Sequence, residues 1–245
     1  MFSCGLWAVL GIGFIFAMTS LGSAAVFIFP AGHSFALQRV TMGFSAGIMT
    51  AASVWSLLLP AIAQAEADLL VPPWMPAAFG LLLGAFFLAG LELIQRRGEG
   101  ERRSLLFAAV TLHNIPEGMA VGLAFALALR GEGLSPALAL AFGIGIQNLP
   151  EGAAVSLPLC QRGMRPVQAF WRGILSGAVE PLFAALAVLA AACLYPLMPW
   201  LLSFSAGAML YVSARELLRE AEGLAGSFAY MGGFTIMMLL DVALG

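Results

Sequence analysis

Two short polar motifs interrupt long apolar runs in this chain: HNIPEG at residues 113–118 and QNLPEG at residues 147–152. A further carboxylate, Glu180, precedes Pro181 in a third apolar run. If these runs cross a membrane, each buried carboxylate costs at least about 2.5–3.5 kcal/mol, and such residues generally serve ion pathways, proton relays or ligand sites. The three glutamates therefore predict a functional site, whereas a single Asn or Gln would more simply indicate interhelical packing.

The spacing within the motifs is helical. His113 and Glu117 are four residues apart, as are Gln147 and Glu151, so each pair shares one face of its helix. Asn114 follows His113, about 100° further around the helix. In the same way, Asn148 follows Gln147. Each helix thus offers a nitrogen or amide ligand and a carboxylate on one face, with a second amide beside them.

The three glutamates lack a basic partner at their own depth in the predicted spans. Carboxylates that face one another without a partner repel, and a divalent cation would supply the missing positive charge. Imidazole suits zinc, iron and copper, whereas carboxylate and amide oxygens are harder ligands. The mixed set, which has no thiolate, indicates a first-row divalent ion.

Each motif also contains a proline, Pro116 or Pro150. A proline inside a helix removes one N–H and frees the carbonyl four residues earlier. Interrupted helices of this kind occur where membrane transporters line a binding site. We therefore expect interrupted helices at both motifs.

The composition indicates an integral membrane protein. The 245 residues are 61% hydrophobic and only 10% charged, whereas an ordinary soluble domain has about 45–50% apolar and about 25% charged residues. The net charge of −2 and the absence of any lysine exclude a basic surface for nucleic acid. Because no loop is long enough for a soluble domain, residues 1–245 are predicted to form a single transmembrane domain.

An all-α fold with eight transmembrane helices is predicted, because a span needs roughly 20 mostly apolar residues. The expected spans are about 5–29, 40–63, 74–95, 105–129, 135–158, 168–194, 197–218 and 226–244. Asp241, near the end of the last span, is expected to reach water.

The arginines predict the orientation. Ten of the eleven lie in or beside the connections 1–2, 3–4, 5–6 and 7–8, and Arg130 alone lies on the opposite side. The positive-inside rule places the ten in the cytoplasm. With an even number of spans, both termini are then extracytoplasmic.

The paired PEG motifs and the Glu-Pro at residues 180–181 resemble those of the ZIP family of divalent metal transporters. The segments GFSAGIMTAASVWSLLLPAI and GGFTIMMLLDVALG are similar to its GufA-like bacterial branch. The resemblance covers essentially the whole chain, and the family fold of eight helices with both termini outside agrees with the span count.

The resemblance also implies a binuclear-type metal centre between helices 4, 5 and 6. One position would use His113, Glu117, Gln147 and Glu151, and the other Asn114, Glu117, Asn148, Glu151 and Glu180. Many members carry His where this chain has Gln147, and some carry Asp where it has Asn148. Both departures imply weaker ligands in the second motif.

Further expectations follow from the same resemblance. Helices 1, 4, 5 and 6 would move as a transport unit against a scaffold of helices 2, 3, 7 and 8, in an elevator-type alternating access. Met49 and Ser56, on one face of span 2, would lie near the outer entrance. The protein would be a homodimer in the bacterial plasma (inner) membrane.

The function predicted is transport of divalent metal ions into the cytoplasm, with Zn²⁺ first and Fe²⁺, Mn²⁺ and Cd²⁺ also possible. The ion is cargo, and no cofactor is expected. An intramembrane metalloenzyme is an alternative, although the chain has no HExxH motif and no obvious separate general base, and we expect no enzyme. A proton-coupled solute carrier is a second alternative. A metal-uptake assay with competing ions separates the three.

Overall fold

The computed structural model describes residues 2–28, 35–68, 71–97, 102–161, 163–193 and 195–244, and these residues form helices and turns without a strand. The α-helices are α1 (Phe2–Ser23), α2 (Phe35–Ala52), α3 (Leu59–Asp68), α4 (Trp74–Arg97), α5 (Arg102–Leu129), α6 (Ser135–Gln161), α7 (Pro166–Gly177), α8 (Val179–Cys193), α9 (Met198–Val212), α10 (Leu218–Glu220) and α11 (Leu224–Leu244). The 3₁₀ turns Ala24–Phe27 and Tyr195–Leu197 and the π-helical segments Ser53–Leu58 and Ser213–Leu217 complete them.

Almost all described residues of the eight predicted spans are helical, and the number of spans stays a prediction. Within the described residues, five stretches are long and apolar enough to cross a membrane by length and composition: Cys4–Phe27, Arg39–Ala67, Trp74–Ile94, Pro166–Ala191 and Leu224–Ala243. A shorter apolar helix covers Asn114–Leu129. The chain is therefore an all-helical integral membrane protein.

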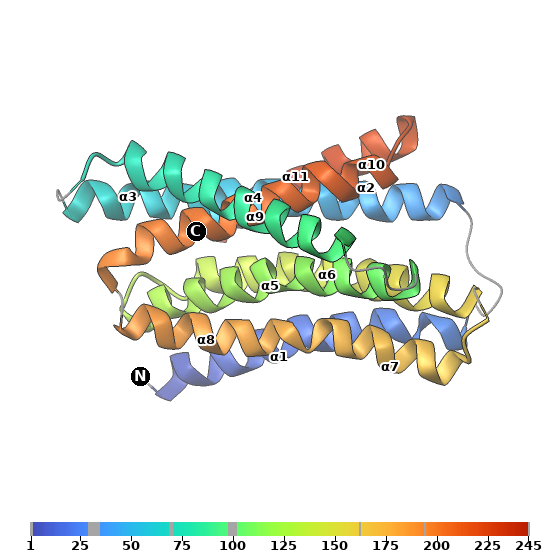
Figure 1. The fold of residues 1–245 in the computed structure, drawn as a ribbon. Helices are drawn as coiled ribbons and strands as arrows, with labels where there is room; N and C mark the ends of the chain where they lie inside the picture. The colour runs from blue at the N-terminus through green and yellow to red at the C-terminus, as the bar shows by residue number, and fades with distance from the viewer. Residues whose placement is uncertain are drawn as a thin grey trace.

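The helices lie in two layers (Figure 1). One layer holds α1, α5, α6, α7 and α8, and the other holds α2, α3, α4, α9, α10 and α11. Within the first layer α1 packs mainly on α6 and α5 on α8, whereas within the second α2 packs on α11 and α4 on α9. The layers meet chiefly where α6 contacts α2 and α11, and where α5 contacts α9.

Prolines shape the helices in different ways. Helix α5 runs without a break through Pro116, and α6 runs without a break through Pro150, so the expected interruptions at the motifs do not occur. The interruption lies instead between α7 and α8, at Ala178. Pro181 explains this position, because a proline clashes with the carbonyl four residues earlier, here that of Gly177.

The π-helical segment Ser53–Leu58 precedes another proline, Pro60. Pro60 has no N–H to donate to the carbonyl of Ser56, and the backbone N–H of Leu59 bonds Val54 O, five residues back. The wider turn rotates the side chains that follow. It therefore changes which residues of this helical stretch face the rest of the protein.

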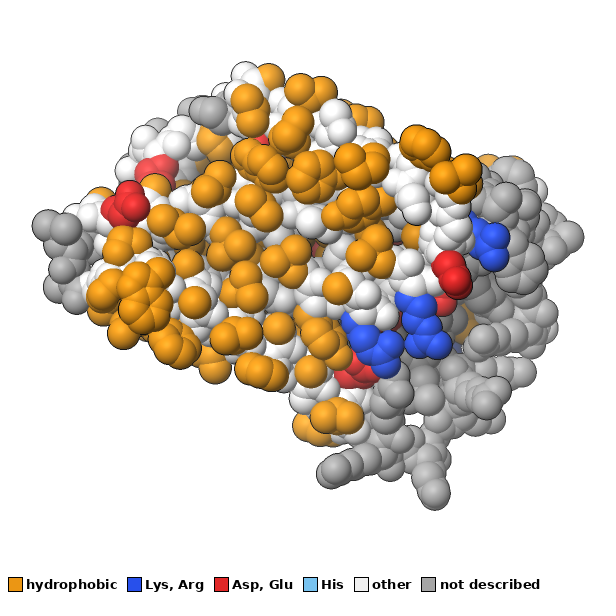
Figure 2. All heavy atoms as spheres, turned by 90° about the horizontal axis from the view of Figure 1, so that it is seen from above, with side chains coloured by type: hydrophobic (Ala, Val, Ile, Leu, Met, Phe, Trp, Pro, Cys, Tyr) orange, Lys and Arg blue, Asp and Glu red, His pale blue; other side chains and the backbone are white. Residues whose placement is uncertain are grey.

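The outer surface is predominantly apolar, as expected of helices that face lipid. Large exposed side chains include Leu10, Phe86, Leu189 and Phe228. Figure 2 shows basic side chains, all arginine in this lysine-free chain, gathered at one end of the visible face. Both chain ends lie toward the opposite end of the bundle (Figure 1).

Candidate metal centre

The structure brings the predicted polar residues of three helices together inside the first layer. Helix α5 supplies Asn114 and Glu117, α6 supplies Gln147, Asn148 and Glu151, and α8 supplies Glu180. All six are buried, and none is more than 6% exposed. His113 belongs to α5, but its side chain lies outside the described part of the chain.

The glycine that ends each motif allows this convergence. A Cβ added at Gly118 would collide with the backbone of Glu180, so α5 and α8 touch at this level. A Cβ added at Gly152 would collide with the carbonyl oxygen of Thr19, which brings α6 against α1. Small residues let membrane helices approach in this way. The two glycines therefore set the distances between the helices that carry the polar groups.

Hydrogen bonds orient the three amide side chains. Gln147 Nε2 donates to Glu117 Oε1 at 2.9 Å, and Asn148 Nδ2 donates to Glu180 Oε2 at 2.9 Å. Asn114 Nδ2 donates to the Ser176 carbonyl at 3.0 Å. Because each NH₂ group faces an acceptor, the oxygen of each amide points elsewhere.

Four oxygen atoms at the site have no hydrogen-bond partner among the described residues. They are Asn114 Oδ1, Glu117 Oε2, Gln147 Oε1 and Asn148 Oδ1. All four accept and none can donate in this arrangement, and a buried acceptor without a partner is costly. Amide and carboxylate oxygens are ligands for divalent cations. A cation among them would satisfy these oxygens together.

The charges lead to the same conclusion. Glu117 is fully buried, and the charged groups that act on it are the carboxylates of Glu151 and Glu180. Like charges held together away from water are unfavourable. A divalent cation between these helices would convert the repulsion into attraction.

No three His, Cys, Asp or Glu side chains in the described part of the chain form a cluster with metal-binding geometry. The polar groups that the described helices bring together are therefore amide and carboxylate side chains from α5, α6 and α8. At residues 147 and 148 the sequence supplies amide side chains, Gln147 and Asn148, where His and Asp would be stronger metal ligands.

The comparisons with known proteins identify the family of the chain. The ZIP zinc transporter family matches residues 100–241, a stretch that includes both motifs and Glu180. The chain belongs to the ZIP zinc transporter family.

Three relatives show how far the likeness to ZIP proteins extends. The zinc transporter GufA of Myxococcus xanthus is 34% identical in an alignment of 247 positions, gaps included, that covers 93% of this chain and 94% of GufA. The zinc transporter ZIPB of Bordetella bronchiseptica is 35% identical in an alignment of 258 positions that covers 98% of this chain and 82% of ZIPB. Human zinc transporter ZIP11 is 34% identical in an alignment of 333 positions that covers 97% of each chain. The resemblance to this family that the motifs indicate is confirmed.

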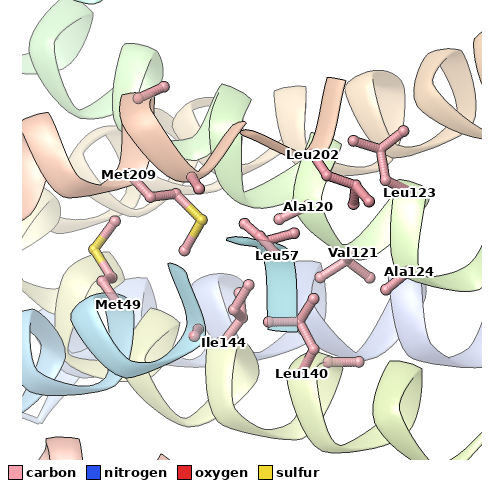
Figure 3. Close-up of a cluster of buried hydrophobic side chains, with 14 of the residues drawn as sticks. Met49, Leu57, Ala120, Val121, Leu123, Ala124, Leu140, Ile144, Leu202 and Met209 are labelled. Carbon is pink, nitrogen blue, oxygen red and sulfur yellow. The ribbon is translucent and has the colours of Figure 1, made fainter. Parts of the chain in front are cut away.

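A cluster of buried apolar side chains, shown in Figure 3, includes residues about one helical turn from the polar motifs. Ala120 and Val121 lie about one turn beyond Glu117 on α5, and Ile144 lies about one turn before Gln147 on the antiparallel α6. Side chains of the second layer, including Leu202 and Met209, pack against them. The cluster thus fills the space between the layers on the side toward the carboxyl end of α5.

Met49 and Ser56, which the resemblance suggests for the outer entrance, occupy different surroundings. Met49 is fully buried in the apolar cluster beside Met209. Ser56 lines a small cavity of about 90 Å³ that Glu132 also lines. The π-helical segment Ser53–Leu58 begins between the two residues and includes Ser56. Met49 and Ser56 therefore do not share one face of a regular α-helix, as the sequence suggests.

Asp241 differs from the sequence-based expectation, because it is only 8% exposed. It accepts a hydrogen bond from Ser56 Oγ at 2.6 Å. Its position near a predicted helix end suggested access to water, but α2 and its π-helical extension pack closely on α11. The packing of these elements therefore covers a carboxylate that the sequence alone would leave in solvent.

Sequence reasoning also missed Thr19. Its hydroxyl donates to Glu180 Oε1 at 2.7 Å and also lies 3.2 Å from the Ile15 carbonyl. A threonine in a membrane helix commonly bonds its own backbone, so its type gives no signal of a distant partner. Only the packing of α1 against α7 and α8 reveals the contact.

Proposed function

We propose that this protein carries divalent transition-metal ions across the membrane into the cytoplasm, with Zn²⁺ as the first substrate and Fe²⁺, Mn²⁺ and Cd²⁺ as further ones. The single observation that carries the proposal is the set of buried oxygens Asn114 Oδ1, Glu117 Oε2, Gln147 Oε1 and Asn148 Oδ1, which have no hydrogen-bond partner among the described residues. Membership of the ZIP family and the names of its zinc-transporting relatives support it. The same findings favour a transporter over an enzyme.

The ion would bind between α5 and α6, where the motifs face each other. The first position uses His113, Glu117, Gln147 and Glu151, with the two glutamates shared with a second position. Asn114, Asn148 and Glu180 complete that second position. The ligands of the first position include one imidazole, and the remaining donors are oxygens. Such a set favours a first-row divalent ion and allows it to be released again.

We infer a topology of eight spans with both termini outside. The arginine-rich end of the molecule would then face the cytoplasm, in keeping with the arginine count and with the location of both chain ends (Figures 1 and 2). The protein would lie in the bacterial plasma membrane as a homodimer.

The two layers would act as a transport unit and a scaffold. The layer of α1, α5, α6, α7 and α8 carries all the proposed ligands, whereas the other layer contributes none. The apolar cluster beyond the site would block the passage to the outside in this conformation (Figure 3). Sliding of the first layer past the second would carry the ion from one side to the other.

The test is Zn²⁺ uptake by proteoliposomes that contain the purified full chain. Glu117→Gln keeps the shape and the bond to Gln147 but removes the charge. It should lower uptake by more than about a hundredfold, because even groups that only support metal ligands contribute about 10–100-fold. Glu222→Gln, at an exposed position outside the site, is the matched control and should leave uptake unchanged.

Uptake by the Glu117→Gln variant at the rate of the parent chain would refute the proposal. Competition by Fe²⁺, Mn²⁺ and Cd²⁺ in the same assay ranks the substrates. Uptake of an organic solute without metal would instead indicate a solute carrier, and metal-dependent hydrolysis that requires Glu117 would indicate an enzyme.

A further inference from the structure

The carboxylate of Glu180 differs from the other acceptors at the site because both of its oxygens are already bonded. Thr19 Oγ1 of α1 donates to Oε1 at 2.7 Å, and Asn148 Nδ2 of α6 donates to Oε2 at 2.9 Å. Glu180 itself is fully buried. Hydrogen bonds to an ionised acceptor are among the stronger ones in proteins. The negative charge of Glu180 is therefore stabilised by protein donors from two neighbouring helices.

Glu117 presents the opposite case. Gln147 bonds only its Oε1, and its Oε2 has no partner among the described residues. A cation that approached Glu117 would find an oxygen ready to bind it. A cation that approached Glu180 would share each oxygen with a donor that is already in place, so it would gain less free energy than at the open oxygen of Glu117.

Asn148 sets this difference through its orientation. Its NH₂ group lies against Glu180, and this positive end of the amide dipole faces the carboxylate that a second ion would need. A carboxylate at residue 148 would have the same shape but no hydrogen to donate. Two facing carboxylates would repel each other and would require a cation between them.

The packing around Thr19 keeps the arrangement closed. A Cβ added at Gly177 would lie 2.7 Å from Thr19 Cγ2 and 3.3 Å from Glu180 Oε1. Only glycine at residue 177 leaves room for the threonine to reach the carboxylate. Gly152 lets α6 approach the backbone of Thr19 on the other side. The threonine hydroxyl is thus held at Glu180 by close contacts with two neighbouring helices.

We propose that Thr19 and Asn148 close the second metal position by satisfying both oxygens of Glu180, so that each chain holds a single transported ion, at the first position. Thr19 is a positioning residue that acts on Glu180 and does not touch the ion. The inference rests on the proposed function, because it assigns the occupancy of the same site.

The experiment counts bound metal in the purified full chain, by equilibrium dialysis against Zn²⁺ followed by elemental analysis. The parent chain should hold a single ion. Asn148→Asp replaces the donor by a carboxylate of the same shape and should add a second ion. With Mn²⁺ in place of Zn²⁺, the electron paramagnetic resonance spectrum should change from that of an isolated ion to that of a coupled pair.

Thr19 is tested in the Asn148→Asp background. Adding Thr19→Val, which keeps the shape but removes the hydroxyl, should tighten binding of the second ion by roughly tenfold, the equivalent of one lost hydrogen bond to a charged group. Adding Thr19→Ser instead keeps the hydroxyl and should leave that affinity unchanged. Equal effects of Val and Ser would contradict the role of the hydroxyl.

Two outcomes separate the inference from the function on which it rests. Two ions in the parent chain, or a single ion in a folded Asn148→Asp variant, would overturn the inference and leave metal transport intact. If the parent chain binds no ion in dialysis and takes up none into proteoliposomes, the proposed function itself fails.

Discussion

Helices within each layer and helices on opposite layers contact each other in different ways. Within the layers, backbones touch at glycines. A Cβ at Gly47 would collide with the Tyr230 carbonyl across α2 and α11, and one at Gly207 would collide with that of Leu81 across α9 and α4. The same holds for Gly122 against Ala184 across α5 and α8. Such contacts fix one helix on another, because a backbone has no room to give way.

Between the layers, side chains make the contacts. A Cβ at Gly143 of α6 would meet the thioether of Met237 on α11, a flexible group that can move aside. Two serines of the second layer reach the motifs of the first. Ser205 Oγ donates to the Pro116 carbonyl at 3.0 Å, and Ser45 Oγ donates to the Gln147 carbonyl at 3.4 Å. These contacts involve side chains, whereas the contacts within each layer involve the backbone.

The difference suggests how one molecule can be both rigid and mobile. Each layer is held together by close backbone contacts that resist change. The surface between the layers has adaptable side chains and a small number of hydrogen bonds. A transport unit that slides against a scaffold requires this combination, and three substitutions test it.

The largest effect is expected from Gly47→Ala, within the second layer. The new Cβ would overlap Tyr230 O and lie 2.6 Å from Phe234 N. Overpacking costs about 1–3 kcal/mol or more, which outweighs the gain of about 1 kcal/mol in helix propensity. The thermal unfolding midpoint of the detergent-solubilised protein should therefore fall clearly. Gly232→Ala, on α11 with nothing within 4 Å, is the control and should not lower it.

If Gly47→Ala and Gly232→Ala unfold at the same temperature, the contact between α2 and α11 is not the rigid one described above.

A smaller effect on stability is expected from Gly143→Ala, between the layers. The new methyl group displaces only the end of Met237, so the free energy of unfolding should change by less than about 1 kcal/mol. Metal uptake should nevertheless slow, because the added group lies on the surface between the layers. Adding Met237→Ala removes the obstructing thioether and should restore uptake. Unfolding as severe as that of Gly47→Ala would remove the distinction between the two kinds of contact.

The smallest effect is expected from Ser205→Ala, which removes one hydrogen bond between the layers. The cost should be about 0.5–1.5 kcal/mol in the state that contains the bond. If the layers slide, the bond forms in one arrangement and is lost in the other, and the uptake rate should then shift by up to about tenfold. Ser227→Ala, whose hydroxyl bonds Gly223 O at an exposed position, provides the control. An unchanged uptake rate would show that the bond to Pro116 does not distinguish the two states.

Local patterns in the sequence indicated much of the fold and most of the candidate site. Long apolar runs predicted the helices because a span has a fixed length. The spacing of His113 with Glu117 and of Gln147 with Glu151 predicted that each pair shares one helix face, and the cost of burying charge made these residues candidates for a functional site. The continuous path of α5 through Pro116 was not predictable, because the consequence of a proline depends on which neighbours satisfy the freed groups.

The sequence by itself determined the chemistry that is available: a membrane chain, two matching motifs and a third helix with Glu180. Tertiary structure alone decided which of these groups remain open to an ion. Thr19 and Asn148 bond Glu180 across 161 and 32 residues of sequence, whereas Glu117 Oε2 has no partner among the described residues. The physical reason is that hydrogen bonds act over about 3 Å in space, so their partners depend on how helices pack and not on their order along the chain.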